Sequence, residues 1–209
     1  MISMLYWSQF ISNIIILYLS MSTETARLQK IAEFYDSETG SYDAGYSSDI
    51  CKAEDAIVAE LLSPITYGKV LDIGAGSGLL CEMFDIDDYF GIELSPQMTS
   101  QAKKKFPHKN FSIADMHRLP FNSDRFDAVI SLYGPISYSL TPEELINEIT
   151  RVTKPGGTVA LMPYTLRVGL NLEIGGYSTA TEKSIEKIFY TGKKLKEILS
   201  GFENVIFMV

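Results

Sequence analysis

The sequence offers few residues from which a metal site or a disulfide framework could be built. Its 209 residues include 2 cysteines and 2 histidines. Cys51 and Cys81 stand far apart without a neighbouring thiol, and His108 and His117 do not show the spacing of zinc ligands. We therefore expect no metal and no structural disulfide, and we expect both cysteines to be buried, reduced thiols.

Positive charge is also scarce. The chain has 18 Lys and Arg residues against 26 Asp and Glu residues, which gives a net charge of -8. Because nucleic acids prefer a basic protein face, this balance argues against a nucleic-acid partner. The 46% hydrophobic content is sufficient for one well-packed core in a chain of this length.

No apolar run is long enough for a convincing membrane span. Residues 1–20 carry no charge, but polar residues interrupt them, and a span needs roughly 20 apolar residues. They also lack the basic start and clear cleavage site of a secretory signal. Two interpretations stay open: an extension ahead of a true start at Met21, or a segment that packs on the protein or contacts a membrane, membrane contact being disfavoured. We expect residues 21–209 to form a single domain in the cytoplasm.

From Met21 onward, helical patterns alternate with short apolar runs. This alternation is typical of a sheet covered by helices on both faces, and it predicts an α/β, doubly wound fold with a mostly parallel sheet. The apolar runs that we expect to form strands are residues 70–73, 89–92, 111–114, 126–132, 158–162 and 205–209.

Several helices are marked by their ends. Residues 95–106 have a helical pattern, and at Thr141 a cap residue precedes a first-turn proline and a glutamate three residues on. This second helix should run to about Val152, after which residues 155–157, Pro-Gly-Gly, should turn the chain into the next strand. A final helix is expected at residues 193–199.

A glycine-rich loop follows the first predicted strand. Residues 72–78, Asp-Ile-Gly-Ala-Gly-Ser-Gly, place glycines at alternate positions between a buried strand and a helical segment. Glycine is needed where the backbone takes a positive φ or where a side chain would fill the volume of a ligand. Glu93 ends the second predicted strand, where a carboxylate can accept hydrogen bonds from ribose hydroxyls. A plain tight turn and a solvated glutamate are the less favoured alternatives.

These residues resemble the first motif of class I S-adenosylmethionine-dependent methyltransferases, an acidic residue followed by alternate glycines. Dinucleotide-binding enzymes instead use Gly-x-Gly-x-x-Gly, and here the third glycine comes one residue early. The resemblance continues in order through residues 112–116, 119–121, 126–131 and 153–157. It covers residues 28–209 and is closest to the small-molecule group that includes quinone methylases. It implies a Rossmann-like methyltransferase fold and S-adenosyl-L-methionine as the cofactor.

The resemblance also implies roles for individual residues. Asp115 is expected to accept a hydrogen bond from the adenine amino group, with Met116 beside the ring. Glu93 is expected to hold the ribose, and Asp72 to face the methionine ammonium. The complete set of expected cofactor-binding residues is Asp72, Gly74, Ala75, Gly76, Gly78, Glu93, Leu94, Asp115, Met116 and Ser131.

Tyrosines are the candidates for shaping an acceptor pocket, because electron-rich rings suit a cationic sulfonium. Ordinary amphipathic packing is the alternative for each of them. Residues 34–36, Phe-Tyr-Asp, and residues 42–43, Tyr-Asp, keep an interval that resembles the cofactor-covering segment of several small-molecule methylases. The pocket candidates are Tyr35, Tyr42, Tyr46, Tyr133 and Tyr138. His117 is a candidate base near the expected site, although a solvated loop residue is the favoured interpretation.

The leading hypothesis is methyl transfer to a small, uncharged or aromatic acceptor that the sequence does not identify. Alignment is the main requirement of such a transfer, so no catalytic residue is assigned. Family members usually end with a sixth and a seventh strand, and this sequence stops at Val209 after the sixth, so we expect the last strand to be lacking. Two alternatives stay open: an NAD-binding oxidoreductase, and a relic that binds the cofactor without turnover. Residues 163–191 are expected to help cover the substrate.

Overall fold

The computed structural model describes residues 24–164, Glu197, Leu199 and residues 205–207. These residues contain a six-stranded sheet in the order β3-β2-β1-β4-β5-β6. All five strand pairings are parallel. The strands are β1 (Lys69–Ile73), β2 (Asp88–Glu93), β3 (Asn110–Ile113), β4 (Phe126–Ser131), β5 (Thr153–Leu161) and β6 (Val205–Phe207). The doubly wound α/β fold predicted from the sequence is confirmed.

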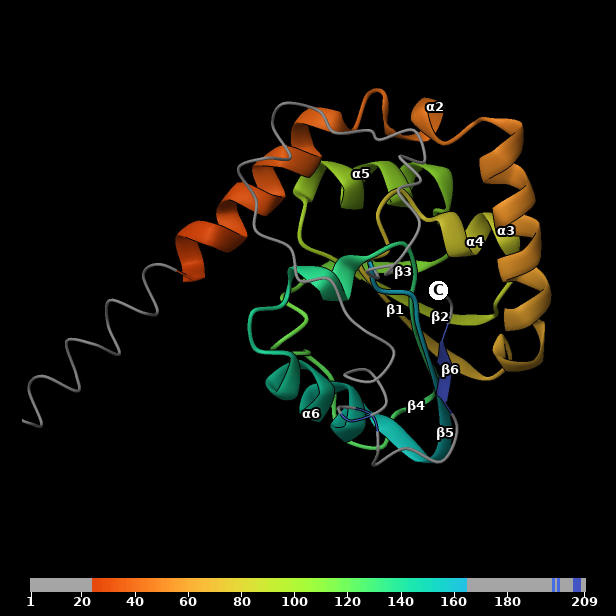
Figure 1. Cartoon of the computed structure of the whole chain (residues 1–209), viewed down its shortest axis with the longest axis vertical. Helices are drawn as coiled ribbons and strands as arrows, with labels where there is room; N and C mark the ends of the chain where they lie inside the picture. Colours follow the sequence, from red (N-terminus) through yellow and green to blue (C-terminus); the bar gives the residue numbers. More distant parts are fainter. Residues whose placement is uncertain (1–23, 165–196, 198, 200–204, 208–209) are drawn as a thin grey trace, which may run out of the picture.

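Helices cover both faces of this sheet. The first is formed by residues 24–38. The others are α2 (Tyr42–Gly45), α3 (Asp49–Leu62), α4 (Leu79–Met83), α5 (Pro96–Lys105) and α6 (Pro142–Val152), with short 3-10 turns η1 (Ser63–Ile65) and η2 (Pro135–Tyr138). In Figure 1, α6 lies across the sheet from α3, α4 and α5. The expected helices at residues 95–106 and 141–152 correspond to α5 and α6.

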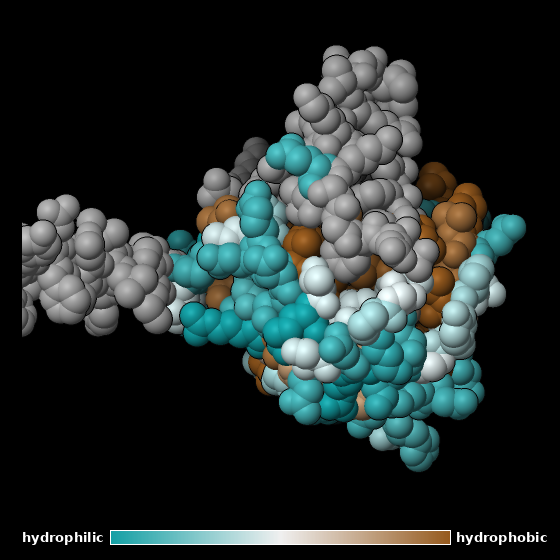
Figure 2. Space-filling model, turned by 90° about the horizontal axis from the view of Figure 1, so that it is seen from below, coloured by the Kyte–Doolittle hydropathy of each residue, from teal (hydrophilic) through white to brown (hydrophobic). Residues whose placement is uncertain are grey.

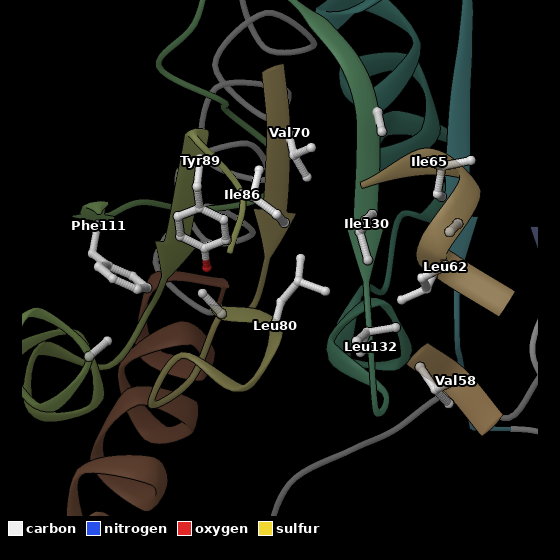
Figure 3. Packing of buried hydrophobic residues seen from close by; sticks show 14 residues of the cluster. Val58, Leu62, Ile65, Val70, Leu80, Ile86, Tyr89, Phe111, Ile130 and Leu132 are labelled. Carbon is white, nitrogen blue, oxygen red and sulfur yellow. The ribbon is translucent and has the colours of Figure 1, made fainter. Parts of the chain in front are cut away.

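Two hydrophobic clusters, one on each face, hold these layers together. On one face, Val58 and Leu62 of α3 pack with Leu80 of α4 and with strand residues such as Val70. Figure 3 shows this packing, including the Tyr89 and Phe111 rings, whose centroids are 5.2 Å apart. On the other face, a cluster joins α6 to the sheet; its members include Leu145, Ile149, Val152, Leu71 and Val159.

The alternation of side chains along β1 assigns its residues to these two clusters. Val70 belongs to the first cluster, and Leu71 and Ile73 belong to the second. All are buried, since both faces of a parallel sheet are covered in this class of fold. The outer side of α6 is polar, and the view from below is largely hydrophilic over the described surface (Figure 2).

The start of α6 and the start of β5 both differ from their predictions. The sequence indicated a capping box at Thr141, but the Thr141 side chain makes no cap hydrogen bond; its carbonyl accepts from the Glu144 N–H. The turn expected at residues 155–157 is instead the irregular beginning of β5, with a register shift opposite Phe126 and Ala128. Gly156 takes a φ of 76° there, so glycine lets the strand continue through the irregularity.

The cysteines also differ from their prediction. Cys51 and Cys81 are free, as expected, but both are partly exposed rather than buried. The region expected to cover the substrate and the helix expected at residues 193–199 lie largely outside the described residues, as do residues 1–20. Within the described ranges, no helix is long and apolar enough to cross a membrane.

The point where the sheet changes direction lies between β1 and β4. From β1 the chain proceeds outward to β2 and β3, and it then returns to place β4 on the other side of β1. The Ser131 hydroxyl at the end of β4 donates to the carbonyl of Ile73 at the end of β1, at 2.9 Å. Ligands of open α/β sheets bind at the carboxyl ends of the strands at such a point.

Candidate cofactor and acceptor site

An open cavity lies at this switch point, with about 750 Å³ of empty space that includes its opening to solvent. The predicted cofactor residues that line it are Gly74, Gly76, Glu93, Leu94, Asp115 and Met116. The predicted residues that do not line it are Asp72, Ala75, Gly78 and Ser131. The structure therefore brings the ends of β1, β2 and β3 together around one cavity, with four expected contacts placed behind its wall.

Glycine is required at the three positions of the loop for different physical reasons. All take a positive φ: 74° at Gly74, 54° at Gly76 and 98° at Gly78. A Cβ on Gly74 would lie 2.3 Å from the Pro135 ring, and one on Gly78 would lie 2.8 Å from the Phe106 ring. A Cβ on Gly76 would meet nothing within 4 Å. Gly76 thus leaves open space beside the cavity, whereas the other two glycines allow close packing.

Glu93, at the end of β2, is held by backbone donors. Its Oε2 accepts from the Gly76 N–H at 3.0 Å, and its Oε1 accepts from the N–H groups of Leu94 and Ser95 at 2.7 and 2.9 Å. Burial raises the pKa of Glu93, although the three N–H groups oppose that shift. The carboxylate is therefore fixed against the glycine loop and faces the cavity.

Asp115 follows β3 and is fixed by His117. Its Oδ1 accepts from the His117 backbone N–H and from the ring Nδ1, both at 2.9 Å. Partial burial opposes ionisation of Asp115, but these hydrogen bonds outweigh it, so the pKa of Asp115 lies below its ordinary value. The His117 side chain is 11% exposed. The favoured interpretation of His117 as a solvated loop residue was therefore wrong, because the fold packs the ring between two chain segments.

Asp72 lies beneath the loop rather than in the cavity wall. Its residue is 3% exposed, and its Oδ2 accepts from the Tyr89 hydroxyl at 2.8 Å. Burial raises the pKa of Asp72 to about 7, and the hydrogen bond from Tyr89 opposes this shift. The Asp72 carboxyl group is thus buried on the α4 side of the sheet. The expected contact with a methionine ammonium stays a prediction.

The remaining predicted cofactor residues shape the loop from behind. Ala75 is buried, and its N–H donates to the carbonyl of Ile92 at 2.9 Å, while its carbonyl accepts from the Gly78 N–H. Ser131 is fully buried and bonds to the end of β1. These contacts hold the ends of neighbouring strands in register, which positions the cavity wall.

The acceptor side of the cavity is lined by tyrosines. Tyr35, Tyr42, Tyr133 and Tyr138 line it, whereas Tyr46 is 47% exposed and stacks on Tyr42 with ring centroids 4.9 Å apart. The Tyr35 and Tyr138 hydroxyls are 2.9 Å apart, and the Tyr133 hydroxyl donates to the Asp55 carboxylate. Burial raises the pKa of Tyr35, Tyr42 and Tyr133. These phenols therefore stay protonated near neutral pH and do not serve as bases.

Residues 24–46 form an N-terminal cover over this cavity, and two aspartates attach it to the core. Asp36 accepts from the Ser95 hydroxyl and from the Gln97 N–H at the start of α5. Asp43 accepts from the Ser77 hydroxyl of the glycine loop. It also accepts from Gln101 at 2.8 Å and Lys105 at 3.0 Å. Sequence reasoning gave these carboxylates no role, although their seven-residue interval was the available signal.

Comparison with known proteins now supports a family. Residues 71–161 match the model of a family described as a methyltransferase domain. The demethylmenaquinone methyltransferase of Renibacterium salmoninarum is 26% identical over 154 residues, which are 70% of this chain and 64% of that protein. The chain thus spans less than two thirds of the length of this relative.

Two solved structures carry the comparison further. A putative methyltransferase from Haloferax volcanii, solved in complex with the Trm112 methyltransferase activator, has a TM-score of 0.61 at 25% identity, covering 80% of this chain and 74% of that one. CalS10 from Micromonospora echinaspora, an amino pentose methyltransferase solved with bound SAM, has a TM-score of 0.52 at 25% identity, covering 60% of this chain and 57% of that one. The Rossmann-like fold is shared by all of them.

Proposed function

We propose that this chain, of which residues 71–161 match a family described as a methyltransferase domain, transfers a methyl group from S-adenosyl-L-methionine to a small, uncharged or aromatic acceptor. The observation that carries this proposal is the placement of Gly76, Glu93 and Asp115 along one wall of a single cavity. The three residues follow β1, β2 and β3, which are neighbours in the sheet. This order suits a cofactor whose methionine, ribose and adenine lie side by side along the wall.

The residues of the wall fit this cofactor. The open space beside Gly76 admits a ligand chain close to the backbone. Glu93 offers the acceptor oxygens that ribose hydroxyls need, and Asp115 offers an acceptor for an exocyclic amino group. Met116 lines the same wall and can pack on a purine ring. When bound, the cofactor supplies an activated methyl group on a cationic sulfur.

The chemistry required of the protein is then mainly alignment. Roughly 7 to 11 kcal/mol of a reaction barrier can be supplied by holding two reactants in a productive geometry. The tyrosines give electron-rich rings beside the cavity, which suit a positive charge. The raised pKa of Tyr35 keeps its hydroxyl protonated, so the Tyr35 and Tyr138 pair keeps one hydroxyl proton that can orient an acceptor oxygen or nitrogen, and neither phenol removes the proton of the acceptor.

The charge of the cavity restricts the acceptor. Among the described residues that line it there is no Lys, Arg or His, while Glu93 and Asp115 contribute carboxylates. An acceptor bearing a carboxylate or phosphate near the reacting atom would therefore find no described counter-charge. The relatives named above act on chemically different acceptors, a demethylmenaquinone and an amino pentose. The proposed class of acceptor therefore rests on the residues that line the cavity and not on the acceptor of either relative.

The proposal extends to the organisation of the chain and its compartment. We propose residues 21–209 as one methyltransferase domain and leave residues 1–20 open between the two interpretations given above. The two free cysteines support a reducing compartment, which in a cell is the cytoplasm.

Isothermal titration of S-adenosylhomocysteine, the reaction product, into the full chain tests the proposal. We expect micromolar binding, and thermal melts should show stabilisation by this ligand but not by NAD. Methyl transfer is then measured with radiolabelled cofactor against a panel of phenols, hydroquinones and primary amines, with carboxylate-bearing analogues as matched controls. Stabilisation by NAD alone would support the oxidoreductase alternative. Tight product binding without turnover on the whole panel would support the relic.

A further inference from the structure

A chain of three hydrogen-bonded polar groups runs from Asp115, which lines the cavity, through His117 to the buried Ser139. The His117 ring donates or accepts at both nitrogens: Nδ1 is 2.9 Å from Asp115 Oδ1, and Nε2 is 2.7 Å from the Ser139 hydroxyl. Ser139 is fully buried and follows η2, 22 positions from His117. The methyl-transfer chemistry proposed above uses neither His117 nor Ser139.

The proton on the ring can be assigned from its partners. An ionised carboxylate only accepts hydrogen bonds, so Nδ1 must carry the proton that faces Asp115. The lowered pKa of Asp115 is consistent with that ionised form. In the neutral ring with this tautomer, Nε2 is an acceptor, and the Ser139 hydroxyl donates a hydrogen bond to it. His117 does not line the cavity, so it is not placed to act as the base that the sequence left open.

The hydrogen bonds from His117 fall on one oxygen of Asp115. Oδ1 receives the ring N–H and the backbone N–H. Within the part of the chain that the structure describes, no hydrogen bond reaches Oδ2. The side chain of Asp115 is 28% exposed and lines the cavity. Two donors on Oδ1 restrict rotation of the carboxylate and leave Oδ2 as the acceptor for a ligand.

We propose that His117 and Ser139 are positioning residues that hold the Asp115 carboxylate toward the 6-amino group of the cofactor's adenine. The inference rests on the proposed function, because it needs an adenine at Asp115. His117 orients Asp115, and Ser139 fixes the tautomer and the rotation of the His117 ring. Selectivity for a 6-amino purine thus depends on residues that do not contact the purine.

Two other roles for this chain of groups are weaker. A Ser-His-Asp arrangement resembles that of hydrolases, but Ser139 is fully buried and does not line the cavity, so a substrate carbonyl has no access to its hydroxyl. A purely structural tie between β3 and η2 would not need both donors to converge on an oxygen of a cavity-lining carboxylate. The convergence therefore favours control of Asp115.

The same contacts connect the adenine side of the cavity to its acceptor side. Ser139 directly follows Tyr138, which lines the acceptor side and meets Tyr35 of the N-terminal cover. Arg27 of the cover donates to the Tyr138 carbonyl. Loss of the Ser139 contact is thus expected to loosen the orientation of Asp115 without removing any group that faces the ligand.

The test compares two ligands that differ at the 6-position of the purine. S-adenosylhomocysteine has an amino group there, and S-inosylhomocysteine has a carbonyl, which cannot donate to Asp115. Titration calorimetry gives the affinity of each ligand for the wild type and for His117→Phe, His117→Asn and Ser139→Ala. Since asparagine keeps an N–H donor near the position of Nδ1, it serves as the conservative variant. His108→Asn is the matched control, because His108 is exposed in the turn after α5.

We expect the wild type to prefer the adenine ligand. His117→Phe should weaken adenine binding about tenfold, with little change for the inosine ligand, because one oriented charge-assisted hydrogen bond is lost. Ser139→Ala should produce roughly a threefold loss of the same kind. His117→Asn should restore part of the preference, and His108→Asn should leave it unchanged.

Equal weakening of both ligands by His117→Phe and Ser139→Ala, or an unchanged ratio, would overturn the inference and leave His117 a packing residue. If His117→Phe does not fold by circular dichroism, the ratios for Ser139→Ala and His117→Asn decide in the same way. A wild type that binds neither ligand contradicts the proposed function instead, so the two failures are distinguishable.

Discussion

The cofactor wall and the N-terminal cover enclose the same cavity but are held in different ways. The wall is built at the ends of β1, β2 and β3, and Glu93 is held by backbone N–H groups. The cover, residues 24–46, reaches the core through side-chain contacts of Asp36 and Asp43. Backbone groups are fixed by the sheet, whereas side-chain contacts can be lost singly. The wall is therefore expected to persist without ligand, and the cover to open.

The difference separates two groups of residues in this chain. Residues that face the cofactor sit on elements whose position is determined by neighbouring strands, and residues that close the cavity sit on a segment attached through a few polar contacts. Binding can then proceed by opening the cover without disturbing the wall. The predictions below either weaken the wall, which should have the larger effects, or weaken the cover.

The largest effect is expected at the base of the wall. The pKa of Asp72 is raised by burial from 3.8 to about 7, so between these values the folded chain binds more protons than the unfolded chain. The free energy of unfolding should therefore fall as pH rises from about 4 to about 7, by about 4 kcal/mol at this site. Asp72→Asn cannot ionise and keeps an acceptor for Tyr89, so it should lose this dependence. Urea unfolding at several pH values measures it.

Asp127→Asn provides a control of opposite sign. The Lys154 ammonium and the Lys69 N–H lower the pKa of Asp127, so its contribution to stability is present above its ordinary pKa and is lost as pH falls. The difference between wild type and Asp127→Asn should thus vanish in acid, whereas the Asp72→Asn variant should differ most from the wild type near neutral pH. Identical slopes for the wild type and Asp72→Asn would mean that Asp72 is ionised in the folded chain throughout.

Glu93→Ala should have the next largest effect, and it tests the wall directly. The substitution removes the acceptor of three backbone N–H groups and the expected ribose contact together. We expect the affinity for S-adenosylhomocysteine to fall about 100-fold or more, since hydrogen bonds to charged groups contribute about 1.5 to 3 kcal/mol each. Calorimetry measures it, with Glu60→Ala on the exposed side of α3 as the control. Unchanged binding would remove Glu93 from the site.

The same difference explains how much the sequence could predict. Strand positions, the glycine loop and the lining residue Glu93 follow from local patterns, because the end of a buried strand is visible as a change from apolar to polar or glycine residues. Asp115 was expected only from the resemblance to a known family. The positions of β1 to β4 were accordingly predicted to within about two residues, a precision usual for periodic elements.

Contacts between distant segments could not be predicted in this way. Asp36 meets Ser95 from 59 positions away, and Asp43 meets Ser77 from 34 positions away. No local pattern encodes such a pairing. His117 is another example, because its ring meets Ser139 from 22 positions away. The interpretation of His117 as a solvated residue was wrong because this contact has no local signal. Asp72 shows a third limit, because the alternation of β1 sends its side chain to the α4 face and away from the cavity.

Asp43→Ala weakens the cover and should have a smaller effect than loss of Glu93. It removes the contacts to Ser77, Gln101 and Lys105 while leaving the wall intact. Asp43 is 42% exposed, so we expect the cofactor affinity to fall only about tenfold, mainly through faster dissociation. Stopped-flow displacement of S-adenosylhomocysteine measures this rate.

Asp49→Ala is the matched control for the cover, because the Asp49 side chain is fully exposed and its ion pair within the described residues is the 3.9 Å contact with Lys52. It should leave the dissociation rate unchanged. A slower association rate for Asp43→Ala with unchanged dissociation would show that Asp43 orders the glycine loop rather than closing the cover.

Tyr35→Phe should give the smallest effect and separates the acceptor side from the cofactor wall. The change keeps the ring but removes the hydroxyl that lies 2.9 Å from the Tyr138 hydroxyl. We expect the KM for an acceptor to rise roughly threefold and the affinity for S-adenosylhomocysteine to stay the same, since one neutral hydrogen bond contributes about 1 kcal/mol or less. Tyr138→Phe removes the same bond from the other side, so the double variant should be no worse than either single one. Additive losses would show that each hydroxyl binds the acceptor independently, and the cover would then contribute to acceptor binding as well as to closure.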